Sequence, residues 1–205
     1  MKHKFLHKNI SKNSRLGKNV EITKDCRIFG DCIISNNCKI TNSCYITTCK
    51  IFENVKICGS TLENSEIGQD SIIGPFSRVR PNTVIGKKCK VGNFVEIKNS
   101  KVGNGSKISH LAYVGDAEIG ENCNIGCGVV FANYDGKTKH KTIIGNNCFI
   151  GSNCTLIAPV EIGDDCFICA GSVVTESVPK NTFVIARSRQ TNKLERAEKY
   201  LKGKN

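Results

Sequence analysis

The chain has 205 residues, a formal net charge of +12, no Trp and only 6% aromatic residues. No apolar run reaches the roughly 20 residues that span a bilayer, and the basic N-terminus lacks the apolar stretch of a signal peptide. We therefore expect one domain of a cytoplasmic protein without a membrane span.

The positive charge is concentrated at the two ends of the chain. Residues 1–24 carry seven Lys or Arg against one Glu, a balance of +6, and residues 187–205 carry seven against two, a balance of +5. No nucleic-acid motif and no aromatic stacking platform accompany these ends. We expect solvated basic tails, no nucleic-acid partner, and a modest attraction for anionic small molecules.

In chain order, residues 1–19 predict an irregular basic lead-in, and residues 20–186 carry a repeat in which an apolar residue returns every six positions, with a few steps of five. The apolar positions are Ile22, Ile28, Ile34, Ile40, Ile46, Ile67, Ile73, Val79, Ile85, Val91, Ile97, Ile108, Val114, Ile119, Ile125, Ile144, Ile150, Leu156, Ile162, Ile168 and Val174. Four residues after most of them stands a small residue, often Cys or Ser.

This pattern predicts short strands that wind into a parallel β-helix. Positions i and i+4 share one face of an extended strand, so each hexad points one large and one small side chain inward. A Gly often follows the apolar residue and gives the backbone freedom to turn a corner. Self-similarity at a fixed period is typical of a solenoid. We therefore predict an all-β fold, a parallel β-helix built from hexapeptide repeats.

The thirteen cysteines are interpreted as packing residues. Nine fall on the small inward position, where a free Cys behaves as a small hydrophobe; they are Cys26, Cys32, Cys38, Cys44, Cys89, Cys123, Cys148, Cys154 and Cys166. Reduced thiols are usual in a cytoplasmic protein. Four others, Cys49, Cys58, Cys127 and Cys169, fall off that position.

Two segments depart from the repeat. Between Phe131 and Ile144 the apolar period is lost, and the polar stretch at about 132–141 contains Asp-Gly, which favours a turn. Such an insertion usually projects as a loop and often carries binding residues. Residues 187–205 form a short charged tail, and the apolar spacing of Leu194, Ala197 and Leu201 favours a short helix within 193–204.

Reactive side chains gather in the middle of the repeat. About 18 residues make one triangular coil, so residues 18 apart can stack on one side. Arg80 and Lys98 have this separation, and His110 and Tyr113 follow within a coil. Two cations near a histidine and a tyrosine suit a phosphorylated small molecule.

A metal site is not expected. A metal-dependent carbonic anhydrase also uses a left-handed β-helix, and it needs three histidines. This chain has only His3, His7, His110 and His140, and no pair lies at coil spacing with a third. Three protein ligands with an open position cannot be assembled from them.

From Gly74 to about Arg187 the chain resembles the C-terminal acetyltransferase domain of the bacterial bifunctional N-acetylglucosamine-1-phosphate uridyltransferase and glucosamine-1-phosphate acetyltransferase. The segments that carry the resemblance are GPFSRVRPNTVIG, VGNFVEIK, HLAYVGDAEIG, NYDGKTKHKTIIG, AGSVVTESVP and IARSRQT. The resemblance implies a left-handed β-helix, an exception to the usual right-handed crossover, and a homotrimer. It also implies acetyl transfer from acetyl-CoA to the amine of glucosamine-1-phosphate in the UDP-N-acetylglucosamine pathway, which supplies peptidoglycan synthesis.

The resemblance also implies residue roles. His110 matches the general base, and a neutral imidazole is suited to take the proton of an attacking amine near neutral pH. Substrate-binding positions are matched by Arg80, Lys98, Tyr113, Asn124 and Lys139. Acetyl-CoA-binding positions are matched by Cys127, Asn133, Tyr134, Ser152, Ala170 and Arg187, with Cys127 standing where the family commonly has Ala. Acetyl transfer requires no metal.

The chain departs from that family in residues 1–73, which contain no Gly-rich nucleotide-binding loop and are already hexads from about residue 20. We therefore expect a stand-alone acetyltransferase, with a separate uridyltransferase as a candidate partner. Two alternatives stay open at this point. The acceptor could be another amino sugar or a nucleotide sugar, or the chain could be a non-enzymatic β-helix that binds a sugar nucleotide.

Overall fold

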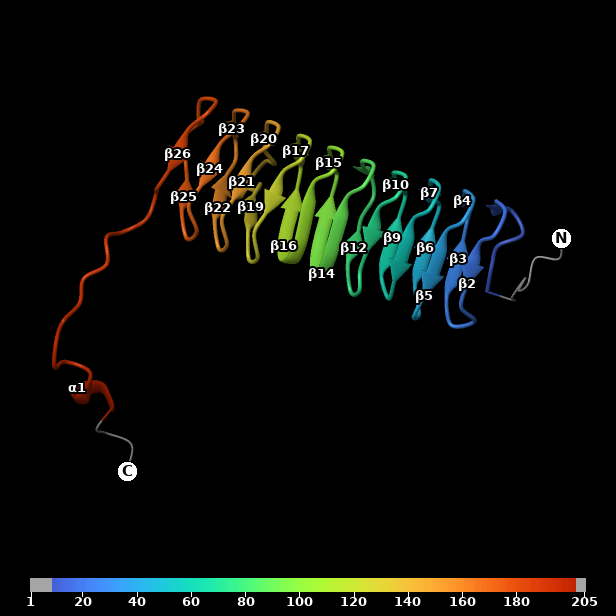
Figure 1. Cartoon of the computed structure of the whole chain (residues 1–205), viewed down its shortest axis with the longest axis horizontal. Helices are drawn as coiled ribbons and strands as arrows, with labels where there is room; N and C mark the ends of the chain where they lie inside the picture. The colour runs from blue at the N-terminus through green and yellow to red at the C-terminus, as the bar shows by residue number, and fades with distance from the viewer. Residues whose placement is uncertain (1–8, 202–205) are drawn as a thin grey trace.

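The computed structural model describes residues 9–201. Residues 1–8 of the lead-in, with His3 and His7, and residues 202–205 of the tail lie outside the described residues. Short strands stack coil upon coil into a long prism, and the C-terminal segment extends away from its end (Figure 1). All pairings between the strands are parallel, so the predicted fold, a left-handed parallel β-helix, is confirmed.

The prism has three faces, each a column of parallel strands. Face 1 holds β1 (Arg15–Leu16), β4 (Ile33–Ile34), β7 (Lys50–Ile51), β10 (Ser65–Ile67), β13 (Thr83–Ile85), β15 (Lys101–Val102), β17 (Ala117–Ile119), β20 (Thr142–Ile144) and β23 (Val160–Ile162). Face 2 holds β2 (Glu21–Ile22), β5 (Lys39–Thr41), β8 (Lys56–Cys58), β11 (Ile72–Ile73), β18 (Asn124–Ile125), β21 (Phe149–Ile150), β24 (Phe167–Ile168) and β26 (Phe183–Val184). Face 3 holds β3 (Arg27–Phe29), β6 (Tyr45–Thr47), β9 (Thr61–Glu63), β12 (Arg78–Val79), β19 (Val130–Ala132), β22 (Thr155–Ile157) and β25 (Val173–Val174).

Two longer strands, β14 (Lys90–Lys98) and β16 (Lys107–Gly115), run from face 2 into face 3. The first half of β14 pairs with β11 and its second half with β12, which shows that the strand turns a corner. The turn falls at Phe94 in β14 and at Leu111 in β16, where φ is 58° and 38°. These two strands therefore join the two faces at the middle of the prism.

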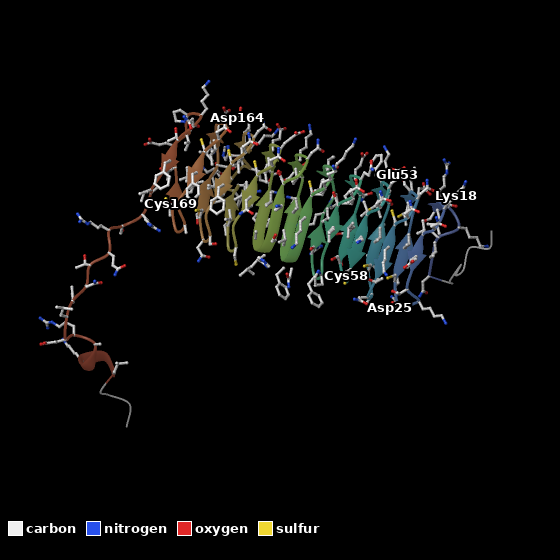
Figure 2. All side chains as sticks on the ribbon, viewed as in Figure 1. Lys18, Asp25, Glu53, Cys58, Asp164 and Cys169 are labelled. Carbon is white, nitrogen blue, oxygen red and sulfur yellow. The ribbon has the colours of Figure 1, made fainter. Side chains whose placement is uncertain are left out.

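We call the edge between faces 1 and 2 corner 1, the edge between faces 2 and 3 corner 2, and the edge between faces 3 and 1 corner 3. Lys18, Glu53 and Asp164 follow corner 1 along the prism, and Asp25 and Cys58 follow corner 2 (Figure 2). A residue at one corner lies directly above or below the equivalent residue of the next coil.

The core is a column of aliphatic side chains, one from each strand, with small residues at the corners. Ile28, Ile46, Ile73 and Ile97 are fully buried, as are most other apolar residues of the hexads. The alternating pattern of β3, with Ile28 inward and its neighbours exposed, is typical of the short strands. Burying one such side chain contributes about 1.5–3 kcal/mol, so the repeat itself supplies most of the driving force for folding.

The thirteen cysteines are free thiols, and eleven are buried, which confirms the packing interpretation of the nine that follow the repeat. Cys49 and Cys169 are buried as well, although they do not stand four residues after an apolar rung. Ile46 and Ile51 are five residues apart, so the corner before β7 is one residue shorter and the small inward position moves to Cys49. Its thiol contacts the Ser65 hydroxyl at 3.3 Å.

The paired coils begin before residue 20. Ile10 bridges Ile28, and β1 pairs with β4. Ile10 and Leu16 pack against the core and extend the column by part of one coil. At the other end, α1 (Glu198–Leu201) is a four-residue helix, shorter than the spacing of apolar residues in the tail indicates. Leu194 is 85% exposed and has no core to pack on. Within residues 9–201 no helix is long and apolar enough to cross a membrane.

Candidate functional site

Two predicted substrate-binding cations lie side by side at the corner 3 edge of face 3. The backbone N–H of Arg80 donates to the carbonyl of Ile97, which places Arg80 next to Lys98 on the adjacent coil. Arg80 Nη1 donates to Glu96 Oε1 at 2.8 Å, and this ion pair holds the guanidinium over face 3. The 18-residue spacing in the sequence thus predicted a real contact between coils.

Lys139 joins this pair from the loop, as a third predicted substrate residue. The Lys139 ammonium lies beside that of Lys98 and lowers the pKa of Lys98, and Arg80 adds to the effect. Like charges that approach each other disfavour the protonated form of a lysine. A dianionic ligand such as a phosphate would relieve this repulsion, so we call Arg80, Lys98 and Lys139 the cation cluster.

A buried carboxylate stands behind the cation cluster at corner 3. Asp116 is only 9% exposed, and its carboxylate accepts hydrogen bonds from Asn99 Nδ2 at 2.5 Å and from Asn133 Nδ2. Burial alone would raise the pKa of Asp116, but these bonds and the nearby ammonium of Lys98 outweigh it and keep the pKa below its ordinary value. The sequence alone assigns no role to Asp116 or Asn99. The sequence does contain a pattern that indicates this contact, because Asn99, Asp116 and Asn133 follow one another at intervals of 17 residues, close to one coil.

Tyr113 lies on face 3 between the corners, and a glycine gives it room. Gly115 pairs with Lys98 on the neighbouring strand. A Cβ atom at Gly115 would lie 2.5 Å from the Tyr113 hydroxyl oxygen and 2.7 Å from Asn133 Nδ2. Any larger residue at this position would therefore displace the ends of the Tyr113 and Asn133 side chains. Asn133, predicted as an acetyl-CoA residue, is 6% exposed and is bound to Asp116.

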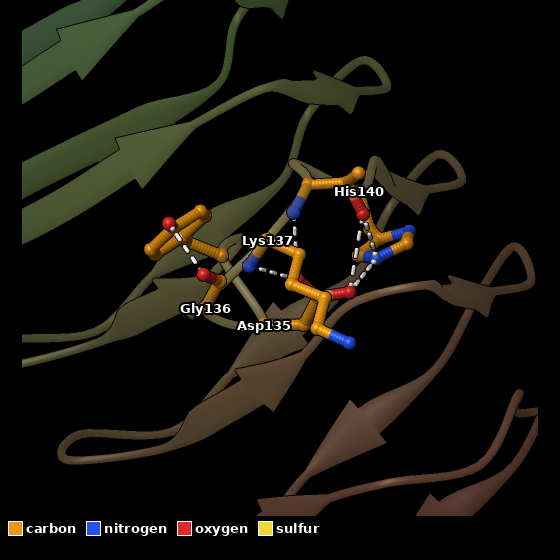
Figure 3. Close-up of polar contacts among 6 residues, drawn as sticks. Asp135, Gly136, Lys137 and His140 are labelled. Carbon is orange, nitrogen blue, oxygen red and sulfur yellow. Dashed lines mark hydrogen bonds and ion pairs between the residues drawn. The ribbon is translucent and has the colours of Figure 1, made fainter.

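The insertion between β19 and β20 forms a tight projecting loop at corner 3 (Figure 3). Tyr134 and Lys139 form an antiparallel bridge, and Asp135 in the turn accepts hydrogen bonds from the backbone of Lys137 and Thr138 at 2.7 Å each. The Tyr134 ring is 60% exposed, and its hydroxyl donates to the Gly136 carbonyl at 2.7 Å. The loop is thus held by its own polar contacts, beside the cation cluster.

Four other predicted residues occupy equivalent positions of successive coils along corner 2, and a fifth, Arg187, reaches them through its side chain. The Gly128 N–H donates to the Leu111 carbonyl, the Asn153 N–H to the Cys127 carbonyl and the Gly171 N–H to the Ser152 carbonyl. These bonds stack the neighbouring positions one coil apart. We call this set the corner 2 column: His110, Cys127, Ser152, Ala170 and Arg187.

All five members of the corner 2 column are exposed. Arg187 Nη1 donates to the Ala170 carbonyl at 2.7 Å, which fixes the guanidinium at the end of the column. The column offers an imidazole, small side chains and a cation in a line, which suits a long ligand with an anionic end. Cys127 is small and exposed to solvent.

Asn124 is separate from the other predicted substrate residues. It lies on face 2, where it pairs with Lys107 on one side and with Phe149 on the other. His110 and the cation cluster are also apart within one chain. In the strand register Lys98 is opposite Gly115, five residues beyond His110 along β16 and on the other side of the corner at Leu111. Apart from Tyr113, the candidate residues therefore occupy the two opposite edges of face 3, with Asn124 beyond one of them.

Among residues 9–201 no three His, Cys, Asp or Glu side chains lie close enough together to hold a metal ion.

Known protein families and proteins are similar to this chain in repeat and in sequence. The family model described as the hexapeptide repeat of succinyl-transferase matches residues 141–176, and that described as the GMPPB C-terminal domain matches residues 10–80 and 61–135, together more than half of the chain. The "Bifunctional protein GlmU" of Caldicellulosiruptor saccharolyticus is 56% identical over 144 residues, which are 70% of this chain and 31% of that protein. The protein of the same name from Clostridium botulinum strain Loch Maree is 49% identical over 156 residues, covering 71% and 34%.

This chain thus spans about a third of the length of the curated relatives it matches, and the matched part is their C-terminal region. Among solved structures, LpxA from Bacteroides fragilis, a UDP-N-acetylglucosamine acyltransferase, superposes with a TM-score of 0.60 at 22% identity. The match covers 87% of this chain and 69% of that one, which shows a common fold.

Proposed function

We propose that this chain, which belongs to the same family of hexapeptide-repeat acyltransferases as the C-terminal acetyltransferase domain of the GlmU proteins, transfers acetyl from acetyl-CoA to the amine of glucosamine-1-phosphate. The observation that carries this proposal is the cation cluster at one edge of face 3, with an exposed histidine at the other edge.

The cation cluster supports a phosphorylated acceptor. An Arg guanidinium offers a planar fork that matches phosphate oxygens, and Lys ammonium groups add point charge. The mutual repulsion of Lys98 and Lys139 falls when an anion binds between them. A neutral sugar would gain nothing from this arrangement, so we expect strong selectivity for the sugar phosphate over the free sugar.

We propose His110 as the general base. The attacking amine loses a proton as its nitrogen bonds to the thioester carbon, and the CoA thiolate then leaves as the C–S bond breaks. A neutral imidazole takes that proton, a step typically worth about 10²–10⁴-fold in rate. The developing oxyanion needs a hydrogen-bond donor, and backbone N–H groups at the corner are suited to this task.

The corner 2 column supports acetyl-CoA as the second substrate. We propose that the acetyl end lies near His110 and that the CoA runs past Cys127, Ser152 and Ala170 towards Arg187. The guanidinium at the far end suits the phosphates of the nucleotide part. The chain's own residues supply binding, positioning and the base, and acetyl-CoA supplies the activated acetyl group.

We further propose a homotrimer with the site between neighbouring subunits. In one chain His110 lies at corner 2 and Lys98 at corner 3, on opposite edges of a convex face, so the two side chains do not converge on one small sugar. Two prisms side by side would bring corner 2 and Asn124 of one against face 3 of the next. A closed cyclic trimer repeats this contact three times. A uridyltransferase is a candidate consumer of the product.

The test is acetyl transfer followed by mass spectrometry of the sugar product, with glucosamine-1-phosphate as acceptor and glucosamine and glucosamine-6-phosphate as controls. We expect acetylation of the 1-phosphate, and loss of about 10²–10⁴-fold in kcat for His110→Ala with CoA binding retained. Acetylation of no acceptor by a protein that still binds CoA would contradict the proposed acceptor. Equal rates for His110→Ala and the unaltered protein would contradict the role of the base.

A further inference from the structure

Resting on the proposed function, we propose that Asp135 and His140 are positioning residues that hold the Lys139 ammonium beside Lys98 to receive the phosphate of the acceptor. Lys139 lies between them in the sequence, on one side of the loop at corner 3. Neither residue was assigned a role from the sequence.

Asp135 organises the turn of the loop. Its Oδ1 accepts the backbone N–H groups of Lys137 and Thr138 at 2.7 Å, and its Oδ2 accepts the Thr138 hydroxyl at 3.1 Å (Figure 3). Its own N–H donates to the Thr138 carbonyl at 3.2 Å. The bonds from Thr138, His140 and Lys137 hold the pKa of Asp135 well below its ordinary value, so it is a carboxylate at neutral pH.

His140 closes the loop onto Asp135 and anchors it to the prism. Its Nε2 lies 2.7 Å from Asp135 Oδ2 and 3.1 Å from the Thr138 hydroxyl (Figure 3). Its backbone N–H donates to the Asn133 carbonyl at 2.8 Å, and the Asn133 side chain is bound in turn to buried Asp116. The loop is therefore tied at its turn by Asp135 and at its base by His140 and Asn133.

The reason for such a closed loop lies in the charge of the residue it carries. Lys139 and Lys98 repel each other, and an exposed lysine on a free loop would move away into water. Fixing the backbone of Lys139 in a bridge with Tyr134 removes that option before the ligand arrives. Preorganisation of this kind lowers the cost of ordering the side chain on binding.

The neighbouring lysines, Lys137 and Lys141, distinguish a specific role of Lys139 from a general effect of the positive charge of the loop. Lys141 Nζ donates to Glu118 Oε1 at 2.8 Å and points to face 1. Lys137 is exposed in the turn, where its backbone N–H contacts Asp135. Lys137→Met therefore removes one positive charge from the same loop without touching the cation cluster, and it is the matched control.

The experiment is a double-mutant cycle on acetyl transfer, with kcat and KM for glucosamine-1-phosphate measured separately. The variants are Asp135→Asn, His140→Phe, His140→Gln, Lys139→Met, the control Lys137→Met, and Asp135→Asn and His140→Phe each combined with Lys139→Met. Circular dichroism and the melting temperature of each variant show that the prism is folded. Residues that act through one another give non-additive effects, which the cycle isolates.

We expect Asp135→Asn to raise KM about 10-fold and to change kcat less than about 3-fold, the size expected for one misplaced charge-assisted hydrogen bond. His140→Phe raises KM by a similar factor, and His140→Gln, which keeps a side-chain N–H, recovers most of it. In the Lys139→Met background neither change raises KM further, and Lys137→Met leaves KM within about 2-fold.

Three results would overturn the inference. Effects of Asp135→Asn that persist in full in the Lys139→Met background would show that Asp135 does not act through Lys139. An unchanged KM in folded Asp135→Asn and His140→Phe would show that neither residue positions anything. Absence of acetyl transfer by the unaltered protein would overturn the proposed function and this inference with it.

Discussion

At the scale of single residues, Asp116 carries the most constrained charge of the candidate site. A carboxylate with 9% exposure is costly unless hydrogen bonds replace its water, and Asn99 and Asn133 supply them. The same carboxylate lies near Lys98 and Lys139 and partly offsets their positive charge. Asp116 thus stabilises corner 3 and keeps the cation cluster together in the absence of a ligand.

We expect Asp116→Asn to lower the free energy of unfolding by about 2 kcal/mol at pH 7, because the amide cannot accept both hydrogen bonds. The pKa of Asp116 is lowered in the folded protein, so its stabilisation is present above the unfolded value of about 4 and is lost as the pH falls through the folded value. The difference between variant and unaltered protein should shrink below about pH 4. Thermal unfolding from pH 7 to pH 2.5 measures it.

The control is Asp31→Asn, at an exposed aspartate on the same edge of the prism, which should change stability by less than about 0.5 kcal/mol. An Asp116→Asn protein as stable as the unaltered one at pH 7 would show that the buried hydrogen bonds contribute little.

A second residue-scale prediction concerns the thiols. Cys127 is exposed, Cys58 is half-buried and accepts a hydrogen bond from Asn42 Nδ2 at 3.1 Å, and the other eleven are buried. Burial raises the pKa of Cys148 to about 11, which leaves little reactive thiolate. We expect a thiol reagent to label one cysteine rapidly in the folded protein, and Cys127→Ser to abolish that fast phase.

Cys148→Ser should leave the fast phase intact and serves as the control. If acetyl-CoA lies along the corner 2 column, its addition should slow the labelling of Cys127 at least several-fold. A fast phase that survives in Cys127→Ser would contradict the exposure argument, and a phase that acetyl-CoA does not slow would count against the proposed course of the cofactor.

Some contacts of the candidate site can be predicted from the sequence and others cannot, depending on whether strand register or side-chain direction creates the contact. The contact of Arg80 with Lys98 follows from coil length, because register alone places residues 18 apart side by side. The hydrogen bonds of Asp116 with Asn99 and Asn133 do not follow from coil length alone. They depend on coils of 17 residues and on the direction of the side chains at a corner. The roles of His110, Asn124 and the corner 2 column come from resemblance and stay predictions.

At the scale of the elements, the strands are set by the alternation of inward and outward side chains. The hexads predicted the strand columns because one face of each short strand must be buried. Inward positions in the shortened coils are harder to predict from the repeat than those in regular coils. Cys49, for example, takes the inward position because the corner before β7 lacks one residue. The insertion at corner 3 was visible as a loss of the repeat, but its closure by Asp135 and His140 depends on contacts among side chains that no period encodes.

Strand β11 offers a matched pair for testing the core. Ile73 is fully buried, whereas its neighbour Ile72 is 43% exposed on face 2. We expect Ile73→Ala to lower the free energy of unfolding by about 2–5 kcal/mol through lost burial and a cavity. Ile72→Ala should change it by less than about 0.5 kcal/mol. Chemical denaturation measures both, and equal losses would contradict the assignment of inward and outward faces.

At the scale of the whole molecule, the proposed function makes the two edges of face 3 complementary halves of one site. One edge holds the cation cluster and the other holds His110 at the head of the corner 2 column. A convex prism cannot close around a small sugar by itself. The proposed trimer solves this geometric problem by placing a corner of one subunit against a face of its neighbour.

Shared sites predict complementation between inactive variants. His110→Ala and Lys98→Met should each lose nearly all acetyl transfer alone. Co-expressed in equal amounts and assembled at random, they should recover about a quarter of the unaltered activity, because a quarter of the interfaces combine two intact halves. Light scattering confirms the assembly state. Trimers with no recovered activity would show that both residues act within one subunit.

The stacking of coils has a metric consequence. Parallel strands are about 4.8 Å apart. Five successive coils therefore each contribute one residue at this interval along the prism: His110, Cys127, Ser152, Ala170 and Arg187. Four coil spacings separate the backbone of His110 from that of Arg187, a span of about 19 Å along the prism. Inserting or deleting one complete coil between them would change that span by about 4.8 Å. The number of coils would therefore set the length of the thioester carrier that fits.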